Sequence, residues 1–141
     1  MTIASFGGSP MPIDLKISHA EHRVTVTASG EINAADFDRI LLAQVEEHAL
    51  SYGKLFDLRG IAVDLSPSDL MAHAGKLAAY ATSDEIGALA LVVDPATNVD
   101  GSVLAALAAA RRPCRMFQDT AKAVEWLRRL RLDRTVRMAK L

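Results

Sequence analysis

Residues 87–95 read Gly87-Ala88-Leu89-Ala90-Leu91-Val92-Val93-Asp94-Pro95. Every position between the glycine and the aspartate is apolar, and the run has the length of a strand rather than of a helix. A strand that is apolar at every position is covered on both faces, as strands inside parallel sheets are. The stretch therefore predicts an α/β domain in which helices cover both faces of a sheet.

Two runs near the N-terminus, at 13–18 and 24–29, alternate apolar and polar residues. This period of two predicts a pair of half-buried strands, and the short connection His19-Ala20-Glu21-His22 predicts that they form an antiparallel hairpin. A short buried strand that runs into a turn is predicted at 54–60, and a final strand is predicted at 114–117.

Helical spacing fills the intervals between these strands. The first helix is predicted from an N-cap at Asn33 to a stop at Gly53, and the second begins at Ser66-Pro67-Ser68-Asp69, where a serine cap precedes a proline and an acid. An Ala-rich third helix is predicted at 99–110, and a fourth begins at 119–120. The apolar faces of the first two helices comprise Phe37, Ile40, Leu41, Val45, His48, Ala49 and Tyr52, and then Leu70, Ala74, Leu77, Ala78 and Ala81.

The predicted order is therefore β-β-α-β-α-β-α-β-α. Strands that alternate with helices need right-handed crossovers, so we expect a mostly parallel sheet of four or five strands and about four helices. Residues 12–132 form this single domain. Residues 1–11, which contain Gly7-Gly8-Ser9-Pro10 and no periodicity, are expected to be a flexible lead-in, and residues 133–141 a basic tail that frays from the last helix.

This arrangement, with the ending Arg115-Met116-Phe117 and then Ala121-x-x-x-Glu125-Trp126-Leu127, resembles the SpoIIAA-like proteins over about residues 12–130. These are bacterial relatives of the STAS domain of anti-sigma-factor antagonists and of the lipid-binding SEC14 domain. The resemblance implies a compact β-α superhelix of four turns, in a family whose members are mostly of unassigned function.

One position departs from the pattern of the STAS domain. Anti-sigma-factor antagonists carry a phosphorylatable Ser or Thr just after the aspartate of the third strand, and Asp57 stands where that acid would. The hydroxyl position holds Leu58 or Arg59, and the next serines, Ser66 and Ser68, begin a helix. The resemblance therefore implies a partner-binding surface without the phosphorylation switch.

Composition is typical of a soluble globular protein, with 141 residues of which half are hydrophobic, 23% charged and 5% aromatic. This length suits one domain, and the single cysteine, Cys114, cannot form an internal disulfide. No apolar stretch approaches the ~20 residues that span a bilayer, and the N-terminus lacks the basic segment of a signal peptide. The expected location is the cytoplasm.

Charge is divided unevenly along the chain. Residues 1–110 have a formal net charge of −8, and residues 111–141 have one of +7. Such a split can mark a surface that binds nucleic acid or an anionic membrane. The basic tail has no interleaved aromatic residues and no clean basic stripe, so we expect no nucleic-acid binding and do not favour membrane association. The simpler interpretation is a basic helix beside an acidic body.

The carboxyl ends of parallel strands meet at one edge of a sheet, where ligands collect. This rule predicts that Asp57 and Arg59 lie near Asp94 and Asn98 and form a binding site for a ligand or partner. The guanidinium of Arg59 could hold a carboxylate or phosphate, and Asp57 with Asp94 would suit acid–base chemistry if burial separated their pKa values. The structural alternatives are a salt bridge from Arg59 to Asp57 or Asp64 and a turn closed by Asp94.

No metal or cofactor is expected. The four histidines, His19, His22, His48 and His73, have no cysteine or third ligand at zinc spacing. Cys114 opens a predicted buried strand and is expected to be an inert core thiol. Because nucleophile elbows, P-loops and dinucleotide-binding glycine motifs do not occur in the sequence, no catalytic residue is assigned.

These observations leave three hypotheses for the function. The first is a non-catalytic binding or regulatory module that contacts a protein partner or a second copy of itself as a homodimer. The second is a carrier of a small apolar or lipid-like ligand, suggested by the resemblance to SEC14 and by the small residues at 72–81 and 105–110. The third is an enzyme that uses the strand-end carboxylates.

Overall fold

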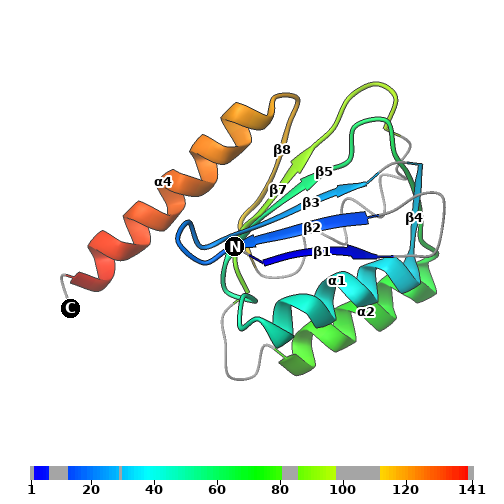
Figure 1. Cartoon of the computed structure of the whole chain (residues 1–141), viewed down its shortest axis with the longest axis horizontal. Coiled ribbons are helices and arrows are strands. Elements are labelled where there is room, and N and C mark those ends of the chain that lie inside the picture. The colour runs from blue at the N-terminus through cyan, green and yellow to red at the C-terminus, as the bar shows by residue number, and fades with distance from the viewer. Residues whose placement is uncertain (1, 7–12, 29, 81–85, 98–111, 140–141) are drawn as a thin grey trace.

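The computed structural model describes residues 2–6, 13–28, 30–80, 86–97 and 112–139 (Figure 1). The predicted helix at 99–110 lies outside these residues. The helices are α1 (Ala34–Glu46), α2 (Pro67–Tyr80) and α4 (Thr120–Ala139). The strands are β1 (Thr2–Phe6), β2 (Ile13–Ser18), β3 (Arg23–Ala28), β4 (Glu31–Asn33), β5 (Gly53–Asp57), β6 (Ala62–Asp64), β7 (Leu89–Val92) and β8 (Cys114–Phe117).

In the described part of the chain, six strands form the main sheet in the order β1-β2-β3-β5-β7-β8. The predicted hairpin is confirmed as β2 and β3, which pair antiparallel with Leu15 opposite Val26. Strands β3, β5, β7 and β8 run parallel to one another. A separate parallel ladder joins β4 to β6, directly before the starts of α1 and α2.

Strand β7 is buried at every position, as its apolar sequence predicted. Leu89 and Leu91 pack in the larger core with residues of α1 and α2, whereas Ala90 and Val92 pack against Ala123 and other residues of α4. Helices therefore cover both faces of the sheet, with α1 and α2 side by side on one face and α4 on the other (Figure 1).

Helix α1 begins with the predicted Asn33 cap. The Asp36 amide donates to Asn33 Oδ1 at 3.1 Å, and the Asn33 amide donates to Asp36 Oδ2 at 3.0 Å. The predicted stop at Gly53 was wrong, because the helix ends at Glu46 and His48 then adopts a left-handed φ of 55°. Gly53 instead begins β5, where an added Cβ would lie 3.2 Å from Leu127 Cδ2.

Helix α2 begins with the same kind of reciprocal cap. The Asp69 amide donates to Ser66 Oγ at 3.1 Å, and the Ser66 amide donates to Asp69 Oδ2 at 2.9 Å. Only part of the predicted apolar stripe is buried: Leu77 is 7% exposed, whereas Ala74 and Ala78 are exposed. Most of the surface of α2 therefore lies outside the core.

The first described segment differs from the expected lead-in. Residues 2–6 form β1, which pairs antiparallel with β2. Thr, Ile and Phe favour strands, and the free edge of the hairpin supplies a backbone ladder for them. The glycines that follow suggested a loop for the whole segment.

The last helix also differs from its prediction. Helix α4 continues to Ala139 instead of fraying near Leu132. Its Leu, Arg, Met and Ala residues are strong helix formers, and Glu125 pairs with Arg128 and Arg129 one turn away. In the described part of the chain, no helix has the length and apolar character needed to cross a bilayer.

Candidate functional site

The strand-end cluster predicted from the sequence is present in part. Asp57 ends β5, and the Nε and Nη2 atoms of Arg59 donate to its Oδ1 and Oδ2 at 2.9 and 2.7 Å. The hydrogen bond from Arg59 lowers the pKa of Asp57 below its usual value. The guanidinium that could have held an anionic ligand is therefore in a two-point salt bridge with its own chain.

Asp94 closes a turn at the exit of β7. Its Oδ1 accepts hydrogen bonds from the amides of Gly60 and Ala96 at 3.1 and 3.0 Å and from Thr97 Oγ1 at 3.1 Å. The bond from Gly60 joins the turn after β5 to the turn after β7, so the predicted proximity of these strand ends is present. Asn98 lies outside the described residues.

These carboxylates are poorly suited to acid–base exchange near neutral pH. Burial alone would raise the pKa of Asp94, but hydrogen bonds from Gly60, Thr97 and Ala96 together lower it below its usual value. The pKa of Asp57 is also lowered. A general acid must hold a proton near neutral pH, and neither of these carboxyl groups does so.

The histidines and the cysteine lie apart from this cluster. His19 Nδ1 is 2.8 Å from the Tyr52 hydroxyl, and His22 stacks on the same ring at 4.8 Å between centroids. Burial raises the pKa of the half-buried Cys114 thiol, as in unreactive cysteines. Within the described residues, no group of three or more His, Cys, Asp or Glu is placed to hold a metal ion.

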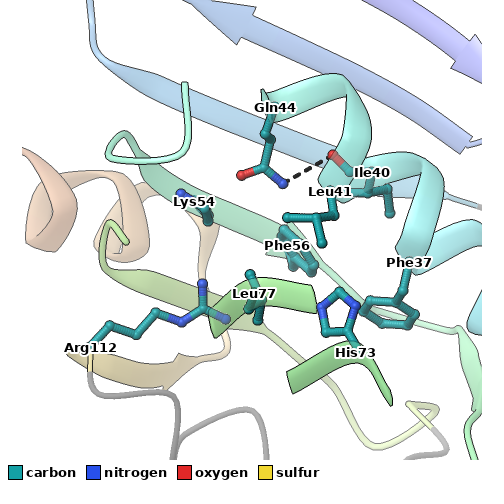
Figure 2. Close-up of a pocket in the computed structure, with 9 residues that line it drawn as sticks. All are labelled: Phe37, Ile40, Leu41, Gln44, Lys54, Phe56, His73, Leu77 and Arg112. Carbon is teal, nitrogen blue, oxygen red and sulfur yellow. Dashed lines mark hydrogen bonds between the residues drawn. The ribbon is translucent and has the colours of Figure 1, made fainter. Parts of the chain in front are cut away.

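A small pocket that the sequence analysis missed lies between α1, α2 and β5 (Figure 2). Its volume is about 20 Å³, which suits one or two water-sized groups. The pocket is lined by Phe37, Ile40, Leu41, Gln44, Lys54, Phe56, His73, Leu77 and Arg112.

Lys54 is the most buried charged residue of this pocket, with 2% of its surface exposed. Its Nζ donates to the carbonyl oxygens of Leu50 and Tyr52 at 2.6 and 2.7 Å. Burial, with repulsion from Arg112 as a second cause, lowers the pKa of Lys54 to about 7. Both hydrogen bonds need only the two N–H groups of a neutral amine, so the site accommodates the uncharged lysine.

Three other polar side chains line the same pocket. Gln44 is 3% exposed, and its Nε2 donates to Ile40 O at 3.2 Å while its Oε1 has no hydrogen-bond partner. The Nε of Arg112 is also buried without a partner, and burial lowers the pKa of this guanidinium. Burial likewise lowers the pKa of His73, whose ring contacts Phe37 edge-on.

Two signals in the sequence could have revealed part of the pocket. Lys54 lies two residues before Phe56 in a strand, so both side chains face the same side of the sheet and Lys54 is forced inward. Gln44 follows Ile40 by four residues and Leu41 by three, which places it on the buried side of α1. Arg112 carries no such signal, because it lies in the connection before β8.

A second feature is the uncovered surface of the two neighbouring helices. Met71 of α2 is 77% exposed, and Tyr80 of α2 and Leu42 of α1 are also exposed. Lys76 Nζ binds Asp38 Oδ2 across the helices at 2.7 Å. Leu42 and Tyr80 follow this ion pair by four residues, one turn further along their helices. On α2, Met71, Ala74 and Ala78 are spaced by three and four residues and therefore share one exposed side of the helix, which we call the outer helical face.

Comparison with known proteins adds three findings. A protein family described as SpoIIAA-like matches residues 23–128. The crystal structure of an uncharacterized protein from the DUF3478 family, with a SpoIIAA-like fold, from Shewanella loihica PV-4 has a TM-score of 0.53 at 18% identity. That alignment covers 83% of this chain and 93% of that chain, and at this identity it shows a shared fold alone. No curated protein matches the sequence.

Proposed function

This chain belongs to the SpoIIAA-like family, and on that basis we propose that it is a non-catalytic binding or regulatory module that acts through protein–protein contact. The outer helical face carries the proposal. Apolar side chains that gather on one exposed side of a helix can form a protein-binding site. Here Met71, Ala74 and Ala78 share one exposed side of α2, and Met71 is 77% exposed.

The state of the strand-end residues supports the non-catalytic part of the proposal. Asp57 and Arg59 bind each other, and Asp94 binds the backbone of its own turn. An enzyme that used these two carboxylates as an acid–base pair would need one of them in a concave site with a raised pKa. Their pKa values are lowered instead.

The pocket beneath α1 and α2 does not favour the alternative of a lipid-like carrier. Its volume of about 20 Å³ is that of a water-sized space, and Lys54, Arg112 and Gln44 line it. Native mass spectrometry of freshly purified protein tests this alternative directly, because a carrier would retain the mass of its apolar ligand.

The contact proposal is tested with Met71→Lys, because a charge in the middle of an apolar interface is costly to bury. Light scattering coupled to size-exclusion chromatography measures self-association over a wide range of concentration. If the partner is a second copy, we expect a dimer whose dissociation constant rises at least about tenfold in the variant.

Met116→Lys is the matched control, because Met116 is also an exposed methionine but lies on β8. If the protein is a monomer, affinity capture is carried out with the wild-type protein and with the Met71→Lys and Met116→Lys variants as baits. A separate partner is a protein that the wild type and Met116→Lys capture and that Met71→Lys does not. A monomer that captures no protein dependent on Met71 contradicts the proposal.

A further inference from the structure

Three side chains at the tip of the hairpin of β2 and β3 form a connected series. His19 lies in the turn between these strands, whereas Glu47 and Tyr52 lie in the segment between α1 and β5. His19 Nδ1 is 2.8 Å from the Tyr52 hydroxyl, and His19 Nε2 is 3.3 Å from Glu47 Oε2. A carboxylate, an imidazole and a phenolic hydroxyl are therefore joined in that order by two hydrogen bonds.

Both hydrogen bonds are satisfied when the proton of neutral His19 is on Nε2. His19 then donates to Glu47, and the lone pair of Nδ1 accepts from the Tyr52 hydroxyl. The imidazole is thus placed to take the phenolic proton, and the carboxylate is placed to stabilise the imidazolium that forms. Nucleophiles in proteins are activated by this arrangement, in which a base contacts the nucleophile and a third group orients the base.

The Tyr52 ring is also held in position at the surface. His22 stacks on it, with 4.8 Å between the ring centroids and 4° between the ring planes. The Gly53 amide donates to His22 O at 3.1 Å, which joins the hairpin turn to the segment that carries Tyr52. Tyr52 is half-buried, but the side chain of His19 is 44% exposed, so a dissolved reagent can reach the hydroxyl that is bonded to it.

We propose that Tyr52 is a modification site for acyl groups and that His19 is the base of the reaction. The co-reactant is an activated acyl donor, of the class of acyl imidazoles, acyl phosphates and thioesters. Acyl transfer suits this arrangement because the attacking oxygen must lose its proton as the new bond forms.

The step is balanced within these groups and the donor. The phenolic oxygen of Tyr52 forms a bond to the acyl carbon, and its proton passes to Nδ1 of His19. The bond between the acyl carbon and the leaving group then breaks, and the leaving group departs with the electron pair and takes the proton from His19. Each chain reacts once, so the step is a covalent modification rather than a catalytic cycle, and it is independent of the contact proposed on α2.

The chain contains an internal comparison, because its second tyrosine is Tyr80 on α2. Tyr80 is 42% exposed, whereas Tyr52 is half-buried. If exposure alone decided the reaction rate, Tyr80 would react faster. Activation by His19 predicts the opposite order.

The first experiment treats the full chain with N-acetylimidazole and follows acetylation of both tyrosines by peptide mass spectrometry. Tyr52 is expected to react at least about tenfold faster than Tyr80. In His19→Gln, the rate at Tyr52 should fall at least about tenfold and the rate at Tyr80 should not change. The matched control is His48→Gln, which removes an exposed histidine of the segment between α1 and β5 and should leave both rates unchanged.

The second experiment separates a base from a structural contact. In His19→Ala, free imidazole added to the solution should restore the rate at Tyr52 without raising the rate at Tyr80. The wild-type rate at Tyr52 should be lower in deuterium oxide than in water, because a proton moves as the bond forms. Glu47→Gln keeps a hydrogen-bond acceptor but removes the charge, so it should lower the rate by a smaller factor than His19→Gln.

Three outcomes would overturn the proposal. These are a wild-type Tyr80 that reacts as fast as Tyr52, an unchanged rate at Tyr52 in a folded His19→Gln, and no effect of imidazole on a folded His19→Ala. The comparison of the two tyrosines uses the wild type alone, so it decides the question even if a substitution at His19 prevents folding.

Discussion

Lys54 and Arg59 are two cations close together in the sequence with opposite environments. Arg59 is exposed and paired with Asp57, whereas Lys54 is buried and donates hydrogen bonds to the carbonyl oxygens of Leu50 and Tyr52. An exposed pair adds little to stability, since water screens it. A buried amine without an acid makes stability depend on pH, and this dependence can be measured.

Lys54→Met removes the titrating group and keeps a side chain of similar length. Between the pKa of about 7 in the folded protein and the ordinary value of 10.5, the unfolded chain binds more protons than the folded one. The stability of the wild type should therefore rise with pH in this window, by at most about 1.4 kcal/mol per pH unit, and the rise should be missing from the variant.

Urea unfolding at a series of pH values across this window measures the slope for both proteins. Lys16→Met, at an exposed position of β2, serves as the control and should keep the slope of the wild type. Parallel stability curves for the wild type and Lys54→Met would show that Lys54 is charged throughout.

At the scale of single elements, the caps of α1 and α2 explain why each helix begins where it does. Asn33 with Asp36 and Ser66 with Asp69 form reciprocal pairs between a side chain and a backbone amide. The ladder of β4 with β6 lies directly before these two starts. Both helices therefore leave the same end of the molecule and run side by side (Figure 1).

Ser66→Ala removes the hydroxyl that accepts from the Asp69 amide. We expect the free energy of unfolding to fall by about 1 kcal/mol, together with faster hydrogen exchange of the amides in the first turn of α2. The control is Ser68→Ala in the same turn, which should change stability by less than about 0.5 kcal/mol. Equal effects of the two substitutions would show that the cap contributes nothing specific.

Across the whole molecule, the start of β7 and the loop before β5 approach each other so closely that only glycine fits. An added Cβ at Gly87 would lie 2.0 Å from the Tyr52 carbonyl oxygen, and the Gly87 amide donates to Leu50 O at 3.0 Å. The same loop carbonyls accept from Lys54. The close contact between Gly87 and the loop before β5 therefore also holds in place the two carbonyl groups that bind Lys54 in the pocket.

Gly87→Ala should prevent this approach, and we expect it to destabilise the protein by more than about 4 kcal/mol or to abolish folding. Gly75→Ala is the control, since Gly75 lies within α2 with open space around it and alanine favours helices by about 1 kcal/mol. Thermal unfolding followed by circular dichroism measures the Tm of both variants. A folded Gly87→Ala variant with the Tm of the wild type would show that the loop before β5 can move away from the added methyl group.

The sequence predicted the features that depend on local pattern. Each of these features is determined by a few neighbouring residues. They are the apolar run of β7, the alternation in β2 and β3, and the helix caps at Asn33 and Ser66. The end of α1 was missed because the apolar spacing continues through Ala49 after the backbone has left the helix. The pairing of β1 was missed because it depends on the edge of the hairpin rather than on its own residues.

The candidate sites show the same limit. Asp57 and Asp94 were placed together by a general rule about strand ends, and a hydrogen bond from Gly60 does join their turns. Lys54 and Arg112 are distant in the sequence, and only the crossover through α2 and β7 brings them to one cavity. The proximity of Lys54 and Arg112 depends on the topology of the whole fold, so it cannot be predicted from a short stretch of sequence.

Strand β8 is the last strand at its side of the described sheet, and its two central residues, Arg115 and Met116, are exposed. A border strand can recruit the border of another molecule and start open-ended stacking of chains. The guanidinium of Arg115 lies 5.3 Å from the centre of the Phe117 ring, so a fixed positive charge stands over the most aromatic part of this border. Two such borders would bring like charges together, so Arg115 disfavours stacking of this kind.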